Sequence, residues 1–417
     1  MSHSNVKLIP GIITSCFARG IFTNDSERQQ KIKRWLNQLN EVYHQECFGE
    51  NNPSRPMPVE LYVLMQKDGA FLRSEITARE LPEGDISVIE LLGYCKYSSV
   101  CEQFAEFIWQ QCQLYNIMPI GFATFIPGIC RNHSEEDDKN RILKRTLTDR
   151  RFESISALVG LRKLAQSLNK KMSNSHYGEG IRNIEIVCGS RVEGLIQSSD
   201  KNKETDSECV MIVENEEGSI PCLLNALREA IEQTNDVTTP FSLEMEPGEL
   251  FLANSLNTLR ECVEQISKDN LLKQNIKLNV DVGHYHLANI MKAPKESSIV
   301  NRHAQLALTG MDLFGMNGNE TDSTLDFYTM IGHVHVSDFD EKAHWGDLPF
   351  DTIHRAEYFT AILNNLAKKL PSDNGQNSMV VSLELEAARA IGTVEKSYRD
   401  LCRSCQAWNE GGPASGP

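Results

Sequence analysis

The sequence has 417 residues, of which 40% are hydrophobic and 24% are charged. That apolar content supports a large folded core and excludes a mainly disordered chain. With 42 basic and 57 acidic residues the formal net charge is −15, which disfavours nucleic acid and anionic membrane surfaces as partners.

No run in the sequence approaches the roughly 18 consecutive apolar residues that a membrane span needs. The first five residues are polar, and no signal-peptide core follows them. We therefore expect a cytoplasmic protein. Among the 12 cysteines, Cys402 and Cys405 have CxxC spacing but lack the second pair of a zinc site, so reduced structural thiols are expected.

Short runs rich in β-branched residues alternate with long periodic stretches that are typical of helices. The predicted strands are 7–14 or 59–66, then 86–92, 120–126, 184–188, 241–244, 276–281, 332–336 and 380–384. The predicted helices include 97–115, 154–171, 223–233, 255–266 and 357–370. About eight strand–helix units predict an α/β fold, a (β/α)8 TIM barrel with enlarged loops.

The length alone would suggest two or three domains at about 150 residues each. Two polar stretches, 45–57 and 190–218, interrupt the alternation, but the rhythm of strands and helices resumes after each of them. We therefore interpret residues 1–409 as a single barrel with loop insertions near 45–57 and 190–218. The Gly- and Pro-containing stretch 410–417 is expected to be a disordered tail.

Acidic and histidine side chains gather where the last four predicted strands end. In chain order, these residues are Glu244 and Glu246, then Asp281, His284 and His286, then His333, His335 and Asp338, and finally Glu384 and Glu386. The carboxyl ends of barrel strands surround one mouth, so side chains from four strands can converge on one ion there.

Side chains alternate along a strand, so both members of each pair 244/246, 333/335 and 384/386 point to the same side. The pattern therefore does not choose between them. A single Glu or His in such a place is more often an ion-paired structural group, but four strand ends in order favour a metal site. An oxygen-rich set with one imidazole suits Mn²⁺, Mg²⁺ or Co²⁺, with Zn²⁺ as an alternative.

Four motifs occur in order: Leu-Glu-x-x-Pro-Gly, Asp-x-Gly-His, His-Val-His-x-x-Asp and a final Leu-Glu. Over residues 242–384 this set resembles the xylose isomerase-like TIM barrel superfamily, and within it the sugar phosphate isomerase/epimerase family. The resemblance implies that Glu244, Asp281, His335 and Glu384 bind the metal. It also implies that Glu244 and Glu384 act as acid and base on opposite faces of the sugar.

The same resemblance implies that His284 contacts a substrate oxygen. We add Glu246 and Trp345 as candidates for substrate binding, although packing of Trp345 within its loop explains that residue equally well. No arginine occurs in the few residues after His335, and the acidic stretch 338–341 disfavours a sugar phosphate unless Lys342 or a distant arginine compensates. His286 and His333 are expected to support the site rather than to bind the ion.

The leading hypothesis is a metal-dependent isomerase or epimerase of carbohydrate metabolism that acts on a sugar or polyol-like small molecule through a metal-stabilised enediolate. A lyase or dehydratase with the same chemistry is the nearest alternative. A non-catalytic barrel and an abasic-site endonuclease are weaker, since the endonuclease class needs extra histidines on early strands that 86–94 and 120–127 lack. The basic stretch 139–151 is interpreted as a solvated helix face or a clamp for an anionic substrate. The oligomeric state stays open.

Overall fold

The computed structural model describes residues 6–17, 20–49, 55–63, 69–84, 86–124, 126, 151–173, 180–187, 195–197, 209–211, 220–235, 237–246, 252–253, 255–292, 327–340, 345–370, 378–385 and 391–410. Several predictions fall outside these residues: the tail 411–417, most of the basic stretch 139–151, Lys342 and Glu386. No helix in the described part of the chain combines the length and apolar character that crossing a membrane requires.

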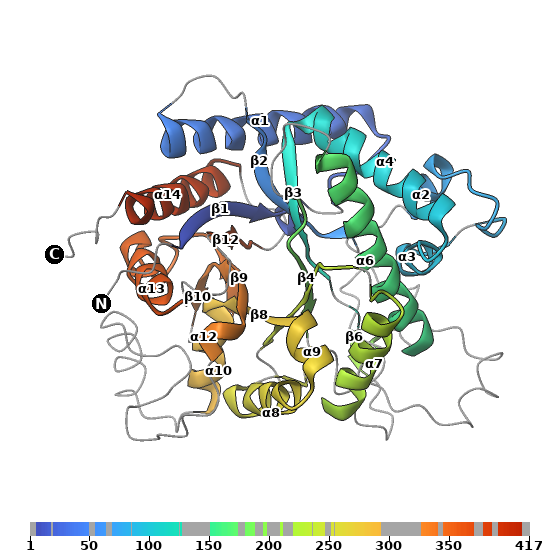
Figure 1. The fold of residues 1–417 in the computed structure, drawn as a ribbon. Helices are drawn as coiled ribbons and strands as arrows, with labels where there is room; N and C mark the ends of the chain where they lie inside the picture. Colours follow the sequence, from blue (N-terminus) through green and yellow to red (C-terminus); the bar gives the residue numbers. More distant parts are fainter. Residues whose placement is uncertain are drawn as a thin grey trace.

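Eight parallel strands close into a barrel, in the order β1-β12-β9-β8-β7-β4-β3-β2. The barrel strands are β1 (Lys7–Ile13), β2 (Met57–Leu61), β3 (Ile117–Phe122), β4 (Asn183–Val187), β7 (Phe241–Glu244), β8 (Ile276–Asp281), β9 (Ile331–Val336) and β12 (Ser378–Leu383). Helices surround the strands (Figure 1). The fold is a (β/α)8 TIM barrel, which confirms the predicted fold class.

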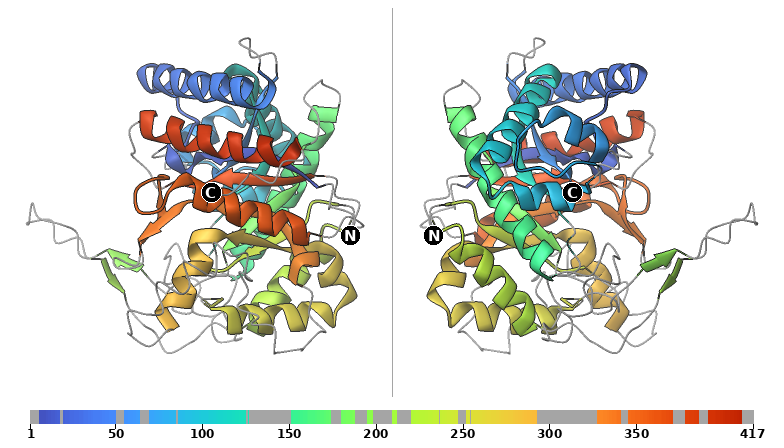
Figure 2. Two further views of the ribbon diagram at one scale, coloured as in Figure 1. Left: turned by 90° about the vertical axis from the view of Figure 1, so that its left-hand side faces the viewer. Right: turned by 90° about the vertical axis from the view of Figure 1, so that its right-hand side faces the viewer.

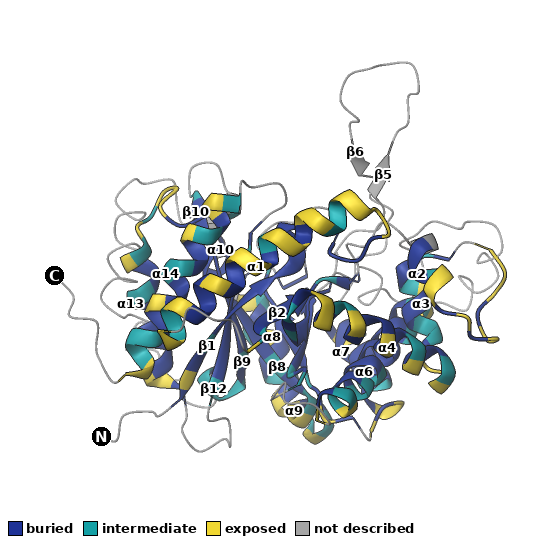
Figure 3. Cartoon of the chain, turned by 90° about the horizontal axis from the view of Figure 1, so that it is seen from above, coloured by how far each residue is buried: buried dark blue, intermediate teal, exposed yellow. Residues whose placement is uncertain are grey.

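The outer layer consists of long amphipathic helices that turn their apolar faces toward the strands (Figure 3). The helices are α1 (Ser26–Phe48), α2 (Gly69–Glu75), α3 (Val88–Tyr94), α4 (Ser98–Tyr115), α6 (Arg151–Ser173), α7 (Ile220–Glu232), α8 (Leu256–Ser267), α9 (Asn270–Asn275), α10 (Val282–Lys292), α12 (Phe327–Met330), α13 (Ala356–Lys369) and α14 (Ile391–Asn409), with a 3-10 turn η1 at Thr14–Cys16. Each of the five predicted helices overlaps one of these.

One predicted strand is wrong. Residues 88–92 of the predicted strand 86–92 lie in helix α3. The stretches 7–14 and 59–66, predicted as alternatives, both include residues of a barrel strand. The run is short and apolar, so its length did not separate a strand from a buried helix. Ser87 accepts from the backbone N–H of Glu90, and the Glu90 carboxylate accepts from the N–H of Ser87, which is a capping box. This Ser-x-x-Glu spacing was the local signal for a helix.

The two predicted loop regions contain regular structure. Residues 45–48 are the last turn of α1, which ends at Gly49 with a positive φ of 66°. The stretch 190–218 contains a short antiparallel pair, β5 (Leu195–Gln197) and β6 (Cys209–Met211). A second antiparallel pair, β10 (Asp338–Asp340) and β11 (Trp345–Leu348), follows β9.

The first and last parts of the barrel are tied together. Strand β1 pairs with β12 over six residue pairs, and α14 packs beside α1 (Figure 2). Asn409 at the end of α14 accepts from the N–H of Leu8 and donates to its carbonyl, each at 2.8 Å. The indole N–H of Trp408 donates to the Val6 carbonyl at 2.8 Å. These bonds satisfy backbone groups at the start of β1.

The main hydrophobic layer lies between the strands and the helices, whereas the inside of the barrel is polar. On β9, His333 and His335 alternate with Val334 and Val336, and all four are buried. Strands β4, β7 and β8 alternate in the same way, with acidic, serine or asparagine side chains between aliphatic or aromatic ones. Besides the two histidines, the buried polar residues of the barrel strands are Glu60, Asn183, Glu185, Ser242, Glu244, Asn279, Asp281 and Ser382. Buried polar groups need hydrogen-bond partners or a bound ion, so the barrel interior is the candidate functional site.

Replacing Gly160 by Ala should destabilise the fold. An added Cβ would collide with the backbone carbonyl of Leu92, because α6 crosses α3 closely at this point. Backbone atoms cannot give way cheaply, so we expect a loss of about 2–3 kcal/mol in the free energy of unfolding, measured with urea. Gly392→Ala on α14 is the matched control, because nothing lies within 4 Å of its added Cβ. Equal stabilities of the two variants would contradict the close crossing.

Candidate metal centre

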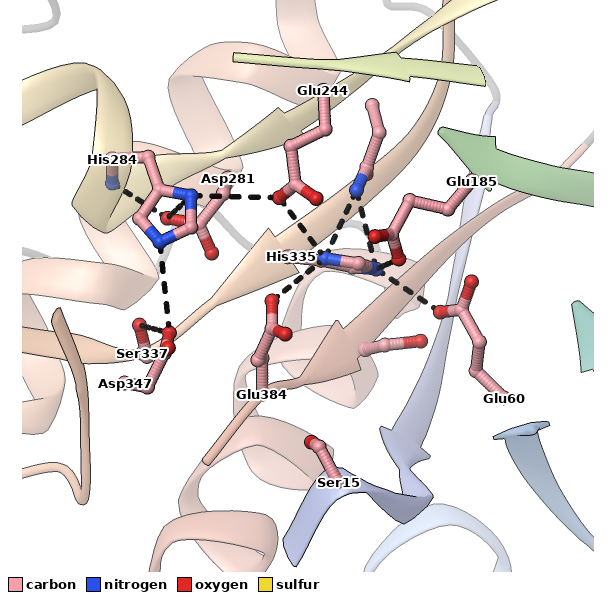
Figure 4. A network of polar contacts seen from close by, with 12 residues as sticks. Ser15, Glu60, Glu185, Glu244, Asp281, His284, His335, Ser337, Asp347 and Glu384 are labelled. Atoms are coloured by element: carbon pink, nitrogen blue, oxygen red, sulfur yellow. Dashed lines mark hydrogen bonds and ion pairs between the residues drawn. The ribbon is translucent and has the colours of Figure 1, made fainter. Parts of the chain in front are cut away.

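Four side chains from four strand ends converge inside the mouth of the barrel (Figure 4). One ligand atom from each of Glu244, Asp281, His335 and Glu384 lies within 4.8 Å of the other three. Glu244 and Asp281 end strands β7 and β8, His335 is near the end of β9, and Glu384 follows β12. Asp281 and His335 are register partners, so the parallel pairing itself brings them side by side. The structure thus brings together the four predicted ligands.

The alternation of side chains did not show which member of the pairs 244/246, 333/335 and 384/386 binds the ion. The depth of the side chains in the barrel separates the members. Glu244 belongs to the four-residue group, and Glu246 lies further out with a quarter of its side chain exposed. His335 belongs to the group, whereas His333 lies deeper in the barrel and contacts Glu60 and Ser382. Glu384 belongs to the group as well, and Glu386 lies outside the described residues.

The donor atoms of this group fit a divalent cation. Within the described residues, the buried atoms Glu244 Oε1, Asp281 Oδ2 and Glu384 Oε2 make no hydrogen bond of good geometry. Glu244 Oε1 and Glu384 Oε2 lie 3.4 and 2.9 Å from His335 Nδ1 as ion pairs. Three carboxylates a few ångströms apart repel one another unless protons or a cation compensate them. One imidazole and three carboxylates form the mixed oxygen-rich set that suits Mn²⁺, Mg²⁺, Co²⁺ or Zn²⁺. These are the residues that would hold the ion.

When no ion is bound, protons reduce the repulsion between these carboxylates. Burial raises the pKa of Asp281 to about 6 and that of Glu384 to about 7, and neighbouring carboxylates add to both shifts. Burial opposes charge on His335, but Glu384 and Glu60 outweigh it and raise its pKa well above the usual range. The pKa of Glu244 is lowered despite burial because His284 and His335 lie beside it. A metal ion must therefore displace protons.

His284 lies on the more exposed side of the group. Its backbone N–H donates to Asp281 Oδ1 at 2.6 Å, which is a bond at the first turn of α10. Its ring Nδ1 is 3.6 Å from both Glu244 Oε1 and Glu246 Oε2. Its Nε2 is 3.8 Å from Asp347 Oδ1. His284 therefore joins the four-residue group to a partly exposed acidic rim.

Two carboxylates form this rim, Glu246 and Asp347. Their side chains are 25% and 19% exposed, compared with 2% for Glu244, so this is the side from which solvent reaches the group. Burial, Glu244, Asp347 and Glu384 raise the pKa of Glu246 to about 8, although His284 opposes the shift. Asp347 has a positive φ of 54°, and Ser337 donates to its Oδ1 at 3.4 Å. Such backbone strain in a polar residue is common at functional sites.

The third candidate for substrate binding, Trp345, has its backbone in strand β11, next to β10. Its side chain lies outside what the structure describes, so its suggested role stays a prediction. Two other strand-end residues serve the fold. Asp338 accepts from the N–H groups of Ile353 and His354 and pairs with the His354 ring at 2.7 Å. His286 stacks on Phe339 at 5.1 Å, outside the groups that could hold an ion.

Sequence reasoning missed two buried acids of the inner barrel, Glu60 on β2 and Glu185 on β4. Glu60 Oε2 is 3.0 Å from His335 Nε2, and Glu185 Oε2 is 3.7 Å from the same atom. Each is a lone acid within an apolar run, Val59-Glu60-Leu61 and Ile184-Glu185-Ile186. In a parallel strand covered on both faces, such an acid must point to a polar interior, and this was the available signal.

No protein-family model and no curated protein matches the sequence. The chain is similar in structure to an L-ribulose 3-epimerase, with a TM-score of 0.44 and 13% identity over 97% of this chain and 93% of the other. It is similar to a D-allulose 3-epimerase from Methylomonas sp. in complex with D-allulose, with a TM-score of 0.45 and 9% identity over 99% of both chains. A crystal structure of IOLI protein with a binding zinc atom has a TM-score of 0.45 and 13% identity over 97% and 98%.

Without a divalent ion, the free energy of unfolding should fall as the pH rises from about 5 to 8. The folded-state pKa values of Asp281, Glu384 and Glu246, about 6, 7 and 8, all lie above those of an unfolded chain. Groups with raised pKa values stabilise the folded protein at low pH, and this stabilisation is lost as the pH rises through their folded-state pKa. The pKa values of His284 and His335 are also raised.

The expected loss is on the order of 2 kcal/mol, measured by urea unfolding in the presence of a chelator. The matched measurement uses saturating Mn²⁺, which replaces the protons and should flatten or reverse the decline. Stability that increases with pH in the chelated protein would contradict the crowding of these carboxylates.

Proposed function

We propose that the protein is a divalent-metal-dependent isomerase or epimerase that acts on a sugar or polyol-like small molecule. The observation that carries the proposal is the convergence of Glu244, Asp281, His335 and Glu384 at one point inside the barrel mouth. The order of strand-end motifs that resembles the sugar phosphate isomerase/epimerase family supports it. When bound, a divalent ion would polarise a substrate carbonyl and its neighbouring hydroxyl, which makes the adjacent C–H more acidic.

Two of the four residues, Glu244 and Glu384, would move that proton. Glu384 Oε2 is 2.9 Å and Glu244 Oε1 is 3.4 Å from the same atom, His335 Nδ1. The two carboxylates come from β7 and from the end of β12, and β8 and β9 lie between these strands in the barrel. They therefore approach the centre from different sides. One carboxylate would take the proton from carbon, and the other would return a proton to the opposite face.

His284 and Glu246 would orient the substrate from the exposed side. Their ring nitrogen and carboxylate oxygen lie 3.6 Å apart, next to Glu244, so both can reach hydroxyl groups of one bound molecule. Burial and neighbouring carboxylates raise the pKa of Glu246 to about 8 in the ion-free protein. Its carboxyl group would form a hydrogen bond with a substrate hydroxyl. The burial of Glu244 and Asp281 keeps bulk water away from the reacting carbon.

The charge around the site favours a substrate without a phosphate. The ion pairs that Glu244, Glu246, Asp281 and Glu384 make within the described part of the site have histidine partners. The carboxylates Glu244, Asp281 and Glu384 lie close to this rim, and their negative charge disfavours a phosphate there. An uncharged sugar or polyol carries hydroxyl groups that can donate to these same carboxylates.

A solvent-deuterium exchange screen tests the proposed reaction. The Mn²⁺-loaded protein is incubated in D₂O with sugars, polyols and hydroxy ketones, and mass spectrometry detects deuterium on carbon. Isomerisation or epimerisation adds deuterium with no other change in composition, whereas a dehydratase would also remove water. Deuterium incorporation that needs the ion is expected. Its absence across the panel, with metal bound, would count against an isomerase or epimerase.

Glu244→Gln and Glu384→Gln should each lower the exchange rate at least about 100-fold, because each removes a group that transfers the proton. Both should also weaken metal binding, measured by calorimetry, since each removes a ligand charge. Asp338→Asn is the matched control, because Asp338 is equally buried at a strand end but pairs with His354. That variant should lose stability yet still bind the ion. Turnover that survives in both Glu variants would overturn the assignment.

A further inference from the structure

A buried carboxylate that the proposed reaction does not use lies directly beneath the metal centre. Glu60 on β2 has no exposed surface, and its Oε2 lies 3.0 Å from His335 Nε2 and 2.8 Å from His333 Nε2. Strands β1 and β12 separate β2 from β9 around the barrel, so these contacts cross its interior. Glu60 and His335 are 275 residues apart in the sequence.

The two ring nitrogens of His335 face different groups (Figure 4). Nδ1 faces Glu244 and Glu384, and Nε2 faces Glu60 and Glu185. The side-chain nitrogen of Asn279 lies 2.9 Å from Nδ1 and 3.3 Å from Nε2, so it can donate to the unprotonated Nδ1 when no ion is bound. A nitrogen that binds a metal must be unprotonated, so an ion held with Glu244 and Glu384 requires the proton of neutral His335 to be on Nε2. Glu60 Oε2, at 3.0 Å, is within hydrogen-bond distance of that N–H. Glu185 Oε2, at 3.7 Å, is too far away.

The carboxylate of Glu60 is itself held in place. Asn183 donates from Nδ2 to Glu60 Oε1 at 3.3 Å, and the His333 ring contacts Oε2. Gly121 on β3 is the register partner of both Glu60 and Asn183. A Cβ on Gly121 would lie 2.9 Å from Glu60 Oε1 and would collide with the Asn183 side-chain oxygen. The absence of a side chain at position 121 therefore leaves the room that the Glu60–Asn183 contact occupies.

We propose that Glu60 is a positioning residue for the metal ligand His335. It accepts the Nε2–H of His335 and so keeps the ring turned with Nδ1 toward Glu244 and Glu384. The inference rests on the proposed metal site, and it assigns a function to a residue that contacts neither the ion nor the substrate. A carboxylate in this position orients the ring and increases the basicity of the ligand, and its loss typically weakens metal binding about 10- to 100-fold.

A competing arrangement uses the same atoms. Glu60, His333 and His335 also form a group whose ligand atoms lie close enough to hold an ion of their own. The separations of 2.8 and 3.0 Å are ordinary hydrogen-bond lengths, which favours the proton over a second cation. The number of ions bound per chain separates the two arrangements.

The test measures Mn²⁺ affinity and stoichiometry by calorimetry, and the visible absorption of bound Co²⁺, for the wild type and Glu60→Gln. If Glu60 positions His335, each wild-type chain binds one ion tightly. The Glu60→Gln variant then binds Mn²⁺ about 10- to 100-fold more weakly and has an altered Co²⁺ spectrum. Thr124→Val is the control, because it removes a buried 2.6 Å hydrogen bond to the Glu185 carbonyl without touching His335. It should lower stability while leaving affinity and spectrum unchanged.

Unchanged affinity and spectrum in Glu60→Gln would overturn the inference, and so would two tight ions per wild-type chain. If Glu60→Gln fails to fold, ¹⁵N NMR of the Mg²⁺-loaded wild type with labelled histidines shows which ring nitrogen of His335 carries the proton. The His335 signal is identified by its loss in His335→Gln. A proton on Nε2 supports positioning by Glu60, and a proton on Nδ1 contradicts it. A wild type that binds the ion without catalysing exchange would refute the proposed reaction and leave the positioning of His335 standing.

Discussion

The crowding of buried negative charge inside the barrel is the constraint on which the site depends. Glu60, Glu185, Glu244, Asp281 and Glu384 are placed around His335, and Glu60, Glu185, Glu244 and Asp281 are buried. In a region of low dielectric they cannot all be ionised without positive charge between them. That positive charge comes from protons or from a divalent ion, and the choice between them couples pH, metal binding and stability.

The strand ends that meet at the metal centre follow from the sequence, because barrel geometry brings the ends of consecutive parallel strands together. The choice of Glu244, His335 and Glu384 over their neighbours on the same face came from the family resemblance, not from the pattern. Glu60 meets His335 only after the barrel closes, across two intervening strands, and no local spacing encodes such a contact. The missed helix at 88–94 has a different cause, since an apolar run of seven residues fits a strand or a buried helix equally well.

The polar interior also changes how the fold is stabilised. In many TIM barrels, layers of branched aliphatic side chains fill the centre. Here many inner positions carry serine, asparagine, histidine and acids beside a few aliphatic residues such as Ile120 and Val380, so apolar burial is concentrated between the strands and the helices. Close helix contacts such as that of α6 with α3 therefore matter more, and the interior is free to be organised by hydrogen bonds.

The pairing of β1 with β12 has a consequence for the order in which the site is assembled. The four candidate ligands lie on the last four barrel strands, and Glu384 follows the final one. During synthesis, β1 must wait for nearly the whole chain before it gains its second neighbour. The candidate ligand set is therefore completed when β12 pairs with β1 and closes the barrel. Binding of an ion by all four residues thus requires the closed barrel.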